Sequence, residues 1–177
     1  REEEAEEAIS DYNERVESIR NQVAPIFGDD TVSPILFFGD TPSLFSPRFE
    51  LEGRVYVLES VSWLYHELRL TPSAEQAALL MTDEGLVFRA ELSGELLPEI
   101  QAEHLVVFPA GYSGANEPGE GYFEFTDGNL IWEALPAVQS GDIYLITGVN
   151  RASGYYTYLD TMERFAEAVL AQTEASD

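Results

Sequence analysis

The order of its apolar patterns constrains the fold of this chain more than any other feature. After a long amphipathic helical pattern, short β-prone apolar runs alternate with further helical patterns. The β-prone runs cover residues 32–38, 49–51, 55–58, 104–108 and 143–147, and the helical patterns cover 2–24, 61–70, 74 onward, 93–100, 129–135 and 159–171. Such alternation is typical of an α/β domain. We therefore expect an α/β fold with a central largely parallel sheet flanked by helices, preceded by a long connecting helix.

The first helical pattern carries a single apolar stripe. Its apolar side chains recur at steps of three or four residues: Ala5, Ala8, Ile9, Tyr12, Val16, Ile19 and Val23. Acidic residues crowd its first turns, where the helix dipole favours negative charge. Pro25 and Gly28 are both helix-ending residues, so we expect the helix to end there.

Proline and glycine predict where several elements turn. Pro34 interrupts the first β-prone run and indicates an edge strand or a late strand start. Residues 39–42 form a turn cluster, and Glu52-Gly53 indicates a hairpin between the two runs that flank it. Thr71-Pro72-Ser73 is a helix-start signal, and Pro136-Ala137-Val138 indicates a turn.

The expected sheet also predicts where a ligand binds. In parallel α/β sheets, ligands bind beside the loops that follow the carboxyl ends of the strands. Loops 39–43, 60–63, 110–113 and 148–156 follow the predicted strands in this way. We therefore expect these loops to form the binding surface.

The charge balance excludes several partners. The chain has 33 acidic residues against nine basic ones, all of them arginine, and a formal net charge of -24. Such a surface repels phosphate backbones and anionic lipid headgroups, so we expect no nucleic-acid partner. High salt would screen the self-repulsion, which favours a salt-adapted, halophilic source, with an acidic protein from an ordinary organism as the alternative.

The lack of cysteine and of long apolar runs excludes several kinds of site and a membrane-spanning segment. The chain has no cysteine, which excludes disulfides, thiolate metal sites and a cysteine nucleophile. No run of 18 or more apolar residues could span a bilayer, and no signal peptide is visible. Because the chain opens on Arg1 within a helical pattern, we expect sequence upstream of it.

Four stretches, taken in order, resemble one family. AISDYNERVESIRNQV is similar to the rigid interdomain helix of class III substrate-binding proteins of ABC transporters. GELLPEIQAEHLVVF resembles a helix–strand segment of that family, NLIWEALPAVQSGDIYLITG resembles its helix, LPAV, polar turn and strand, and YLDTMERFAEAVL resembles its closing helix. The resemblance implies an interdomain helix over residues 1–28 and the C-terminal α/β lobe of a two-lobe binding protein over 29–177.

The resemblance also implies a function. A class III protein of this type captures an iron–siderophore complex between two lobes and delivers it to the permease subunits of an ABC importer. It would be extracytoplasmic, either periplasmic or a cell-surface lipoprotein, with no enzyme activity and no cofactor. Cobalamin or haem binding, an acidic α/β enzyme and a stand-alone interaction domain remain as alternatives. No Gly-x-Ser-x-Gly elbow supports the enzyme.

One segment departs from the family pattern. In SVSWLYHELRLTPS the family usually carries a glycine and a glutamate that docks an arginine of the permease. Arg69 stands near the glycine position, and both Glu59 and Glu67 are candidates for permease docking.

Six residues are candidates for ligand binding. They combine one cation with aromatic or hydrogen-bonding side chains: Arg151, Tyr155, Tyr156, Tyr112, Trp63 and Asn150. An arginine offsets the charge of an anionic chelate, and aromatic rings can stack on it. For each there is a structural alternative: Arg151 can pair with a surface carboxylate, and the aromatic side chains can pack in the core, in a loop or beneath the final helix.

The sequence does not favour a site that binds a metal ion directly or a phosphate-binding loop. The two histidines, His66 and His104, lack metal-ligand spacing, and we expect His104 to be a hydrogen-bonded structural residue. The glycine-rich stretch 111–121 lacks the lysine and Ser/Thr of a P-loop. We interpret it as a mobile loop and candidate lid, within an insertion that covers 111–128.

Overall fold

The computed structural model describes residues 2–46, 48–51, 54–57, 59–82, 85–111, 113–149 and 155–176. The helices are α1 (Glu2–Phe27), α2 (Glu59–His66), α3 (Ala74–Leu79), η1 (Leu97–Glu99), α4 (Glu120–Thr126), α5 (Leu130–Glu133), α6 (Pro136–Ser140) and α7 (Tyr155–Ser176). The strands are β1 (Thr31–Phe38), β2 (Thr41–Phe45), β3 (Arg48–Leu51), β4 (Arg54–Val57), β5 (Thr71–Pro72), β6 (Met81–Thr82), β7 (Gly85–Leu86), β8 (Arg89–Glu91), β9 (His104–Phe108) and β10 (Ile143–Leu145).

The central sheet is mixed. Its order is β10-β9-β1-β2-β8, and β5 pairs with the start of β1. Strands β10, β9, β1 and β5 are parallel, whereas β2 and β8 run antiparallel to their neighbours. The expected α/β fold is confirmed, and four of the six strands are parallel, while β2 and β8 add an antiparallel part that was not expected. The turn at Gly39, which has φ +65°, sends the chain straight back as a hairpin instead of into a crossover helix.

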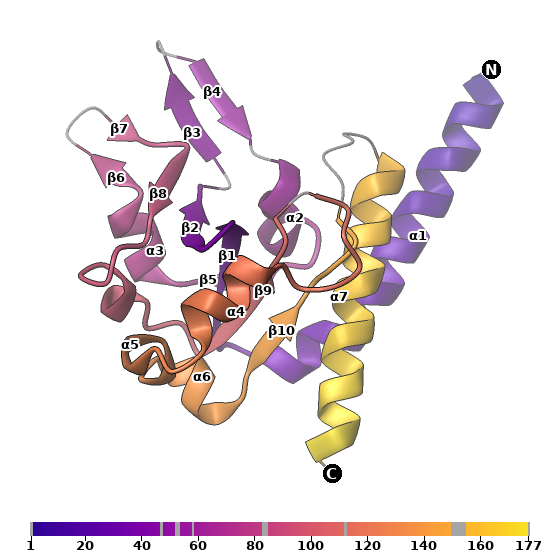
Figure 1. Ribbon diagram of the computed structural model, residues 1–177. Coiled ribbons are helices and arrows are strands. Elements are labelled where there is room, and N and C mark those ends of the chain that lie inside the picture. Colours follow the sequence, from indigo (N-terminus) through magenta and orange to yellow (C-terminus); the bar gives the residue numbers. More distant parts are fainter. Residues whose placement is uncertain are drawn as a thin grey trace.

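Helices cover both faces of this sheet (Figure 1). On one face, α1, α2 and α7 pack on the inward side chains of β1 and β9, including Leu36 and Val106. On the other face, η1, α4, α5 and α6 pack on the alternate side chains of the same strands, including Phe37 and Val107. The strands are therefore apolar on both faces, which explains their continuous apolar runs.

Helix α1 is buried over its second half only. The residues that enter the core are Val16, Ile19, Val23 and Phe27. Pro25 lies inside the last turn, so the expectation that it ends the helix is wrong. Burial of Phe27 keeps the chain helical beyond the proline, and Gly28, at φ +57°, ends the helix with its N–H 3.0 Å from the carbonyl oxygen of Ala24.

Pro34 lies in the central strand, so the expected edge position is also wrong. On one edge, β1 pairs with β9 throughout residues 32–36. On the other edge, β1 pairs with β5 at residues 31–32 and with β2 from residue 35 onward. Pro34 therefore lies at a break in the second ladder, where the sheet tolerates a proline.

The structure confirms some of the turns and short elements predicted from local sequence and contradicts others. The β3–β4 hairpin, strand β9 and the helix start at Ser73 are confirmed, and the Ser73 side chain accepts from the backbone N–H of Gln76. Asn129, at the start of a predicted helical pattern, caps α5 by accepting from two backbone N–H groups. The predicted turn at 136–138 is wrong, because Pro136 begins α6, which Gly141 ends at φ +85°. The predicted helix over 93–100 contains only η1, and α4 forms in the segment interpreted as an insertion loop.

Candidate functional site

Three loops meet at the carboxyl edge of the parallel strands. They follow β1, β9 and β10, and helix α7 begins at the same edge (Figure 1). The glycine-rich loop after β9 is joined to the loop after β10 by two backbone hydrogen bonds. The N–H of Gly114 lies 2.9 Å from the Val149 oxygen, and that of Gly148 lies 2.6 Å from the Ala115 oxygen. The loop expected to be a mobile lid is therefore anchored at its middle.

Helix α4 packs directly on the β1–β2 turn. A Cβ placed on Gly121 would lie 2.2 Å from the carbonyl carbon of Gly39, so only glycine fits at this contact. A Cβ on Gly111 would lie 2.8 Å from the Phe37 oxygen, and that residue has φ +53°. These two glycines let the loop and helix after β9 approach the end of β1 closely.

Arg89 reaches this edge from β8. Its guanidinium carbon lies 4.7 Å from the centre of the Phe38 ring, at the last residue of β1. Its Nε donates to the Ser43 hydroxyl at 3.0 Å, and its Nη2 lies 2.7 Å from a carboxylate oxygen of Glu91. A guanidinium that lies over an aromatic ring and is held by a hydroxyl and a carboxylate is a fixed cation rather than a free surface side chain.

Aromatic rings continue from this arginine. The ring of Phe38 lies 5.7 Å from that of Phe45, which in turn meets Phe88 edge to face at 5.1 Å. Phe88 is 45% exposed, although Phe45 is buried. We call Phe38, Phe88 and Arg89 the Arg89 cluster. It offers a cation beside apolar ring surface, which suits a bulky organic ligand that carries negative charge.

Sequence reasoning missed the Arg89 cluster. Strand β8 is three residues long and was not predicted, and its partner β2 carries Pro42 and Ser43, which weaken a strand pattern. The available signal was local: Arg89 is one of only nine cations and directly follows an aromatic residue. This local signal does not indicate that Arg89 contacts Phe38, because the order of strands in the sheet brings the two residues together.

Most predicted ligand-binding residues are not described by the structure. Tyr112, Asn150 and Arg151 lie outside the described residues. Tyr155 and Tyr156 form the first turn of α7, and only their place in the helix is described. Their roles in binding therefore stay predictions.

Trp63 is placed in the core instead. Its side chain is 2% exposed and meets the Phe165 ring edge to face at 5.5 Å. It has no exposed face for a ligand in this structure, so the expectation that it lines the cleft wall is replaced by the core alternative. As part of an apolar helical stripe, it contributes to packing between α2 and α7.

The two docking candidates lie at opposite ends of α2. Glu59 is its first residue, and only its place in the helix is described. Glu67 follows the helix and lines a pocket together with Ala8, Tyr12 and Leu159. Its backbone oxygen accepts a hydrogen bond from Arg20 at 2.7 Å. Nearby, Arg69 has φ +61°, a conformation that favours the glycine that the family carries near this position.

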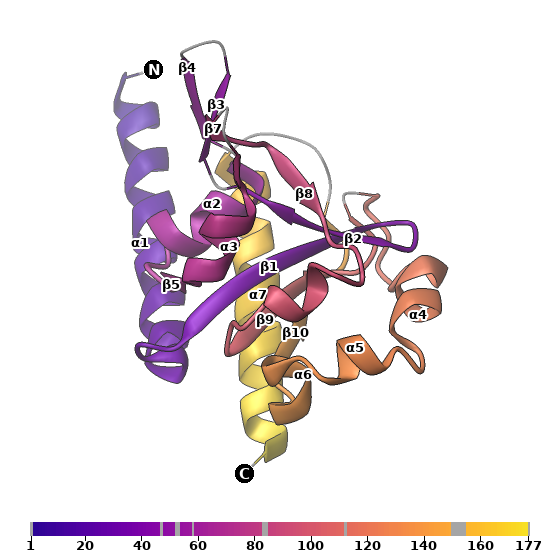
Figure 2. The ribbon, with the colours of Figure 1, turned by 90° about the vertical axis from the view of Figure 1, so that its left-hand side faces the viewer.

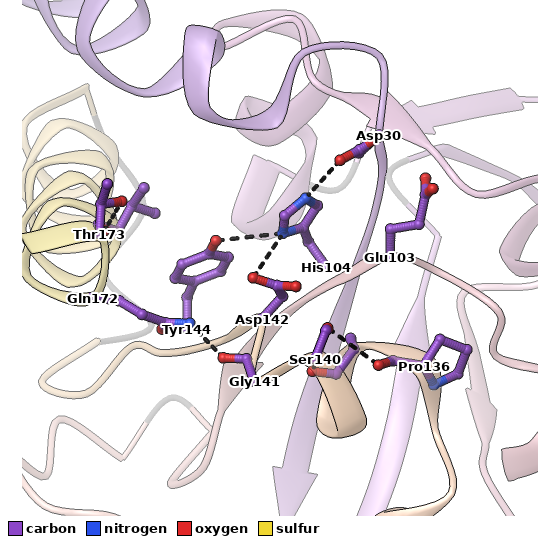
Figure 3. A network of polar contacts seen from close by, with 12 residues as sticks. Asp30, Glu103, His104, Pro136, Ser140, Gly141, Asp142, Tyr144, Gln172 and Thr173 are labelled. Carbon is purple, nitrogen blue, oxygen red and sulfur yellow. Dashed lines mark hydrogen bonds and ion pairs between the residues drawn. The ribbon is translucent and has the colours of Figure 1, made fainter. Parts of the chain in front are cut away.

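A polar network closes the opposite, amino edge of the sheet (Figure 3). His104 Nε2 lies 3.4 Å from an oxygen of Asp30, and its Nδ1 lies 3.3 Å from the Tyr144 hydroxyl and 4.0 Å from an oxygen of Asp142. The His104 ring also meets Phe27 edge to face at 4.7 Å. Burial, assisted by the charge of Asp142, raises the pKa of Tyr144 to about 12.

This network is structural and not a metal site. Its two carboxylates lie beside opposite nitrogens of the His104 ring, so they cannot join one ring nitrogen around a single ion. The expectation that His104 is a satisfied structural residue is confirmed. Among the described residues, no group of three or more His, Cys, Asp and Glu side chains could hold a metal ion. In the same part of the chain, no helix is long and apolar enough to cross a membrane.

Comparisons with known proteins address the fold. A scan against models of protein families found no match, and a search of curated proteins found none either. Among solved structures, a periplasmic binding protein component of a Fep/Fec-like ferrichrome ABC transporter from Bacillus subtilis is similar, with TM-score 0.69 and 21% identity. The similarity covers 95% of this chain and 57% of that protein.

Two ligand complexes are similar as well. FhuD2 from Staphylococcus aureus with bound ferrioxamine B matches with TM-score 0.67 and 18% identity, over 96% of this chain and 59% of that protein. The triscatecholate siderophore binding protein FeuA from Bacillus subtilis, complexed with ferri-bacillibactin, matches with TM-score 0.67 and 19% identity, over 96% of this chain and 54% of that protein. The chain therefore spans less than two thirds of these proteins and has the FhuD-type fold over that part, which confirms the resemblance at the level of the fold.

Proposed function

We propose that this chain is the C-terminal lobe, with its interdomain helix, of a substrate-binding protein that captures a ferric siderophore for an ABC importer. The observation that carries this proposal is the similarity of fold over 95–96% of the chain to proteins described as siderophore-binding. Residues 1–28 would be the connecting helix and residues 29–177 the lobe.

The Arg89 cluster is the part of the described lobe best suited to hold such a ligand. Its guanidinium would offset negative charge on the chelate, and the exposed Phe88 ring would cover the apolar part of the ligand. Arg151, Tyr112 and the tyrosines that open α7 would add to the same surface. No residue of the cluster is a nucleophile or a general base, which fits binding without chemistry.

The remaining roles follow from the same proposal. Glu67, with Glu59 at the other end of α2, would dock the importer's permease outside the cytoplasm. The proteins of similar fold include a periplasmic component of a transporter, which supports this location. A salt-adapted source stays a prediction that is based on the net charge of -24 alone.

A binding titration of the complete gene product tests the function. We would measure intrinsic tryptophan fluorescence at high salt during titration with ferrioxamine B, ferri-bacillibactin, cobalamin and haem in turn. Saturable quenching by a ferric siderophore at micromolar or lower concentration supports the proposal. Quenching by cobalamin or haem alone would move the function to that ligand, and a folded protein that binds none of the four would refute it.

Two matched pairs of variants test the site. Arg89→Gln should weaken siderophore binding about tenfold, since the positive charge that would offset the negative charge of the chelate is lost. Arg15→Gln changes the net charge equally, but Arg15 pairs with Glu163 between α1 and α7, so binding should stay the same. Likewise, Phe88→Ala should weaken binding and Phe123→Ala should not, although both rings are about half exposed. Equal effects within each pair would contradict the proposed site.

A further inference from the structure

The carboxyl edge of the sheet carries more carboxylates than cations. Three exposed carboxylates lie there on the segments that follow β1 and β9: Asp40, Glu117 and Glu120. Figure 2 shows α4, which Glu120 begins, next to the β1–β2 turn that holds Asp40. The two segments touch, because a Cβ on Gly121 would lie 2.5 Å from the backbone nitrogen of Asp40. Within the described part of the chain, none of the three carboxylates is paired with an arginine.

The two arginines described at this edge already have carboxylate partners. Nη2 of Arg89 lies 2.7 Å from an oxygen of Glu91, and Nε of Arg164, on α7, lies 2.8 Å from an oxygen of Asp160. Arg164 reaches the loop after β10, since its Nη1 lies 2.7 Å from where a Cβ of Gly148 would be. Each pair has no net charge, so the exposed carboxylates set the sign of the charge at this edge.

The rest of the lobe does not reverse this balance. Arg151, in the loop after β10, would add one positive charge, and three arginines would then face five carboxylates. The β3–β4 hairpin has two arginines and two glutamates between residues 48 and 57, so its charges balance. The whole chain has a formal net charge of -24, so its long-range field has the same sign as the edge.

The sign of this charge separates two classes of ferric chelate. The donor oxygens of every ferric siderophore carry negative charge, which the guanidinium of Arg89 can meet at short range. The net charge of the chelate also includes the iron. Three singly charged hydroxamates balance Fe³⁺, whereas three doubly charged catecholates leave three negative charges in excess. A chelate with that excess meets a surface of its own sign, and attraction to one arginine that is already paired with Glu91 would not compensate for the repulsion.

We propose that the carboxyl edge selects ferric chelates whose net charge is zero or positive and discriminates against polyanionic chelates such as triscatecholates. The inference rests on the proposed function and narrows its class of ligand. It assigns a role in selectivity to Asp40 and Glu120, which attract a positively charged group of the chelate and repel a negatively charged one. Arg89 meets the donor oxygens of both classes, so it contributes to affinity and not to this selectivity.

One series of ligands changes the charge without changing the iron centre. It consists of ferrioxamine B with its terminal amine free, acetylated or succinylated, so the net charge of the chelate is positive, zero or negative. Affinities are measured by tryptophan fluorescence on the complete gene product, at the lowest salt concentration at which circular dichroism shows a folded protein. The succinylated form should bind about tenfold more weakly than the free amine, with the acetylated form between them. Ferri-bacillibactin should bind more weakly than all three.

The possible outcomes separate this inference from the proposed function. Equal affinities across the series, or tighter binding of the succinylated form, would overturn the inference and leave siderophore binding intact. A folded protein that binds no member of the series and no ferri-bacillibactin would instead refute the proposed function, and the inference with it.

Two double variants separate the carboxyl edge from the overall charge of the chain. Asp40→Asn with Glu120→Gln removes two negative charges at the edge. Glu17→Gln with Glu174→Gln removes two exposed charges on α1 and in the last turn of α7. Only the first variant should reduce the preference for the free amine over the succinylated form, by about threefold or more. An equal reduction by both variants would mean that the net charge of the chain selects the ligand, and would overturn the role of the edge.

Discussion

The two edges of the central sheet both carry charged and aromatic side chains, but they use them differently. At the amino edge, the buried His104 ring meets partners at both nitrogens and on its aromatic face. At the carboxyl edge, Arg89 lies over Phe38 while the neighbouring Phe88 ring remains half exposed. The comparison shows how a structural polar cluster differs from a candidate binding site: its groups satisfy one another and leave no surface for a ligand.

The largest effect should come from filling the close contact below the carboxyl edge. Gly121→Ala should lower the free energy of unfolding by about 3 kcal/mol, because its Cβ would overlap the backbone of Gly39. Gly94→Ala is the control, since its Cβ meets only the Ile131 side chain at ordinary contact distance and should cost less than about 0.5 kcal/mol. Urea denaturation measures both, and equal stability of the two variants would contradict the packing of α4 on the β1–β2 turn.

Substitution at the amino edge should lower the stability of the protein without changing its affinity for the ligand. His104→Ala should cost about 2 kcal/mol of unfolding free energy, because a buried ring and its hydrogen bonds are lost. Siderophore affinity should stay the same. His66→Ala is the matched control, as this exposed histidine ends α2 and should have almost no effect on stability. A loss of affinity in His104→Ala at full stability would break the distinction between the edges.

Substitution at the carboxyl edge should lower the affinity for the ligand with little change in stability. Arg89→Gln should change the unfolding free energy by less than about 1 kcal/mol, because the side chain is partly exposed to water. Its expected loss of ligand affinity is about tenfold, or about 1.4 kcal/mol. Denaturation and titration of the same sample measure both quantities. If Arg89→Gln unfolds the protein as readily as His104→Ala does, the Arg89 cluster is structural.

The smallest effect should appear only in strong alkali. The pKa of Tyr144 is raised to about 12 in the folded protein, above the ordinary value of 10.0 for tyrosine. The folded state therefore keeps this proton when the unfolded state has lost it, so stability is full below pH 10 and falls as pH rises toward 12, by at most about 1.4 kcal/mol per pH unit.

Tyr144→Phe tests this linkage. The variant should lose stability less steeply than the parent between those pH values in urea denaturation. Tyr65, whose pKa burial also raises, leaves a common background in both proteins. An unchanged slope would mean that folding does not raise the pKa of Tyr144.

Much of the fold follows from local patterns. Strand β9 was predicted with its observed bounds because a short apolar run that is rich in β-branched and aromatic residues and lies between polar loops is typical of a buried strand. The start of α3 was predicted from Ser73, whose hydroxyl accepts from the N–H of Gln76. The candidate site was predicted less well. The loops after β1, β9 and β10 do meet at the carboxyl edge as expected, but residues 60–63 lie within α2, which follows a strand of a separate sheet. Trp63 lies in the core, and Arg89 was not considered.

The sequence by itself determined the long first and last helices, the apolar strands β1, β9 and β10, and an arrangement of helices flanking a sheet. The periodicity of apolar side chains and the capping of helices involve residues a few positions apart, so both can be predicted from the sequence. Only the tertiary structure decided that Pro34 stands in the central strand, that β2 and β8 run antiparallel, and that Arg89 meets Phe38. These depend on which strands become neighbours, and that choice is set by packing between residues far apart in sequence.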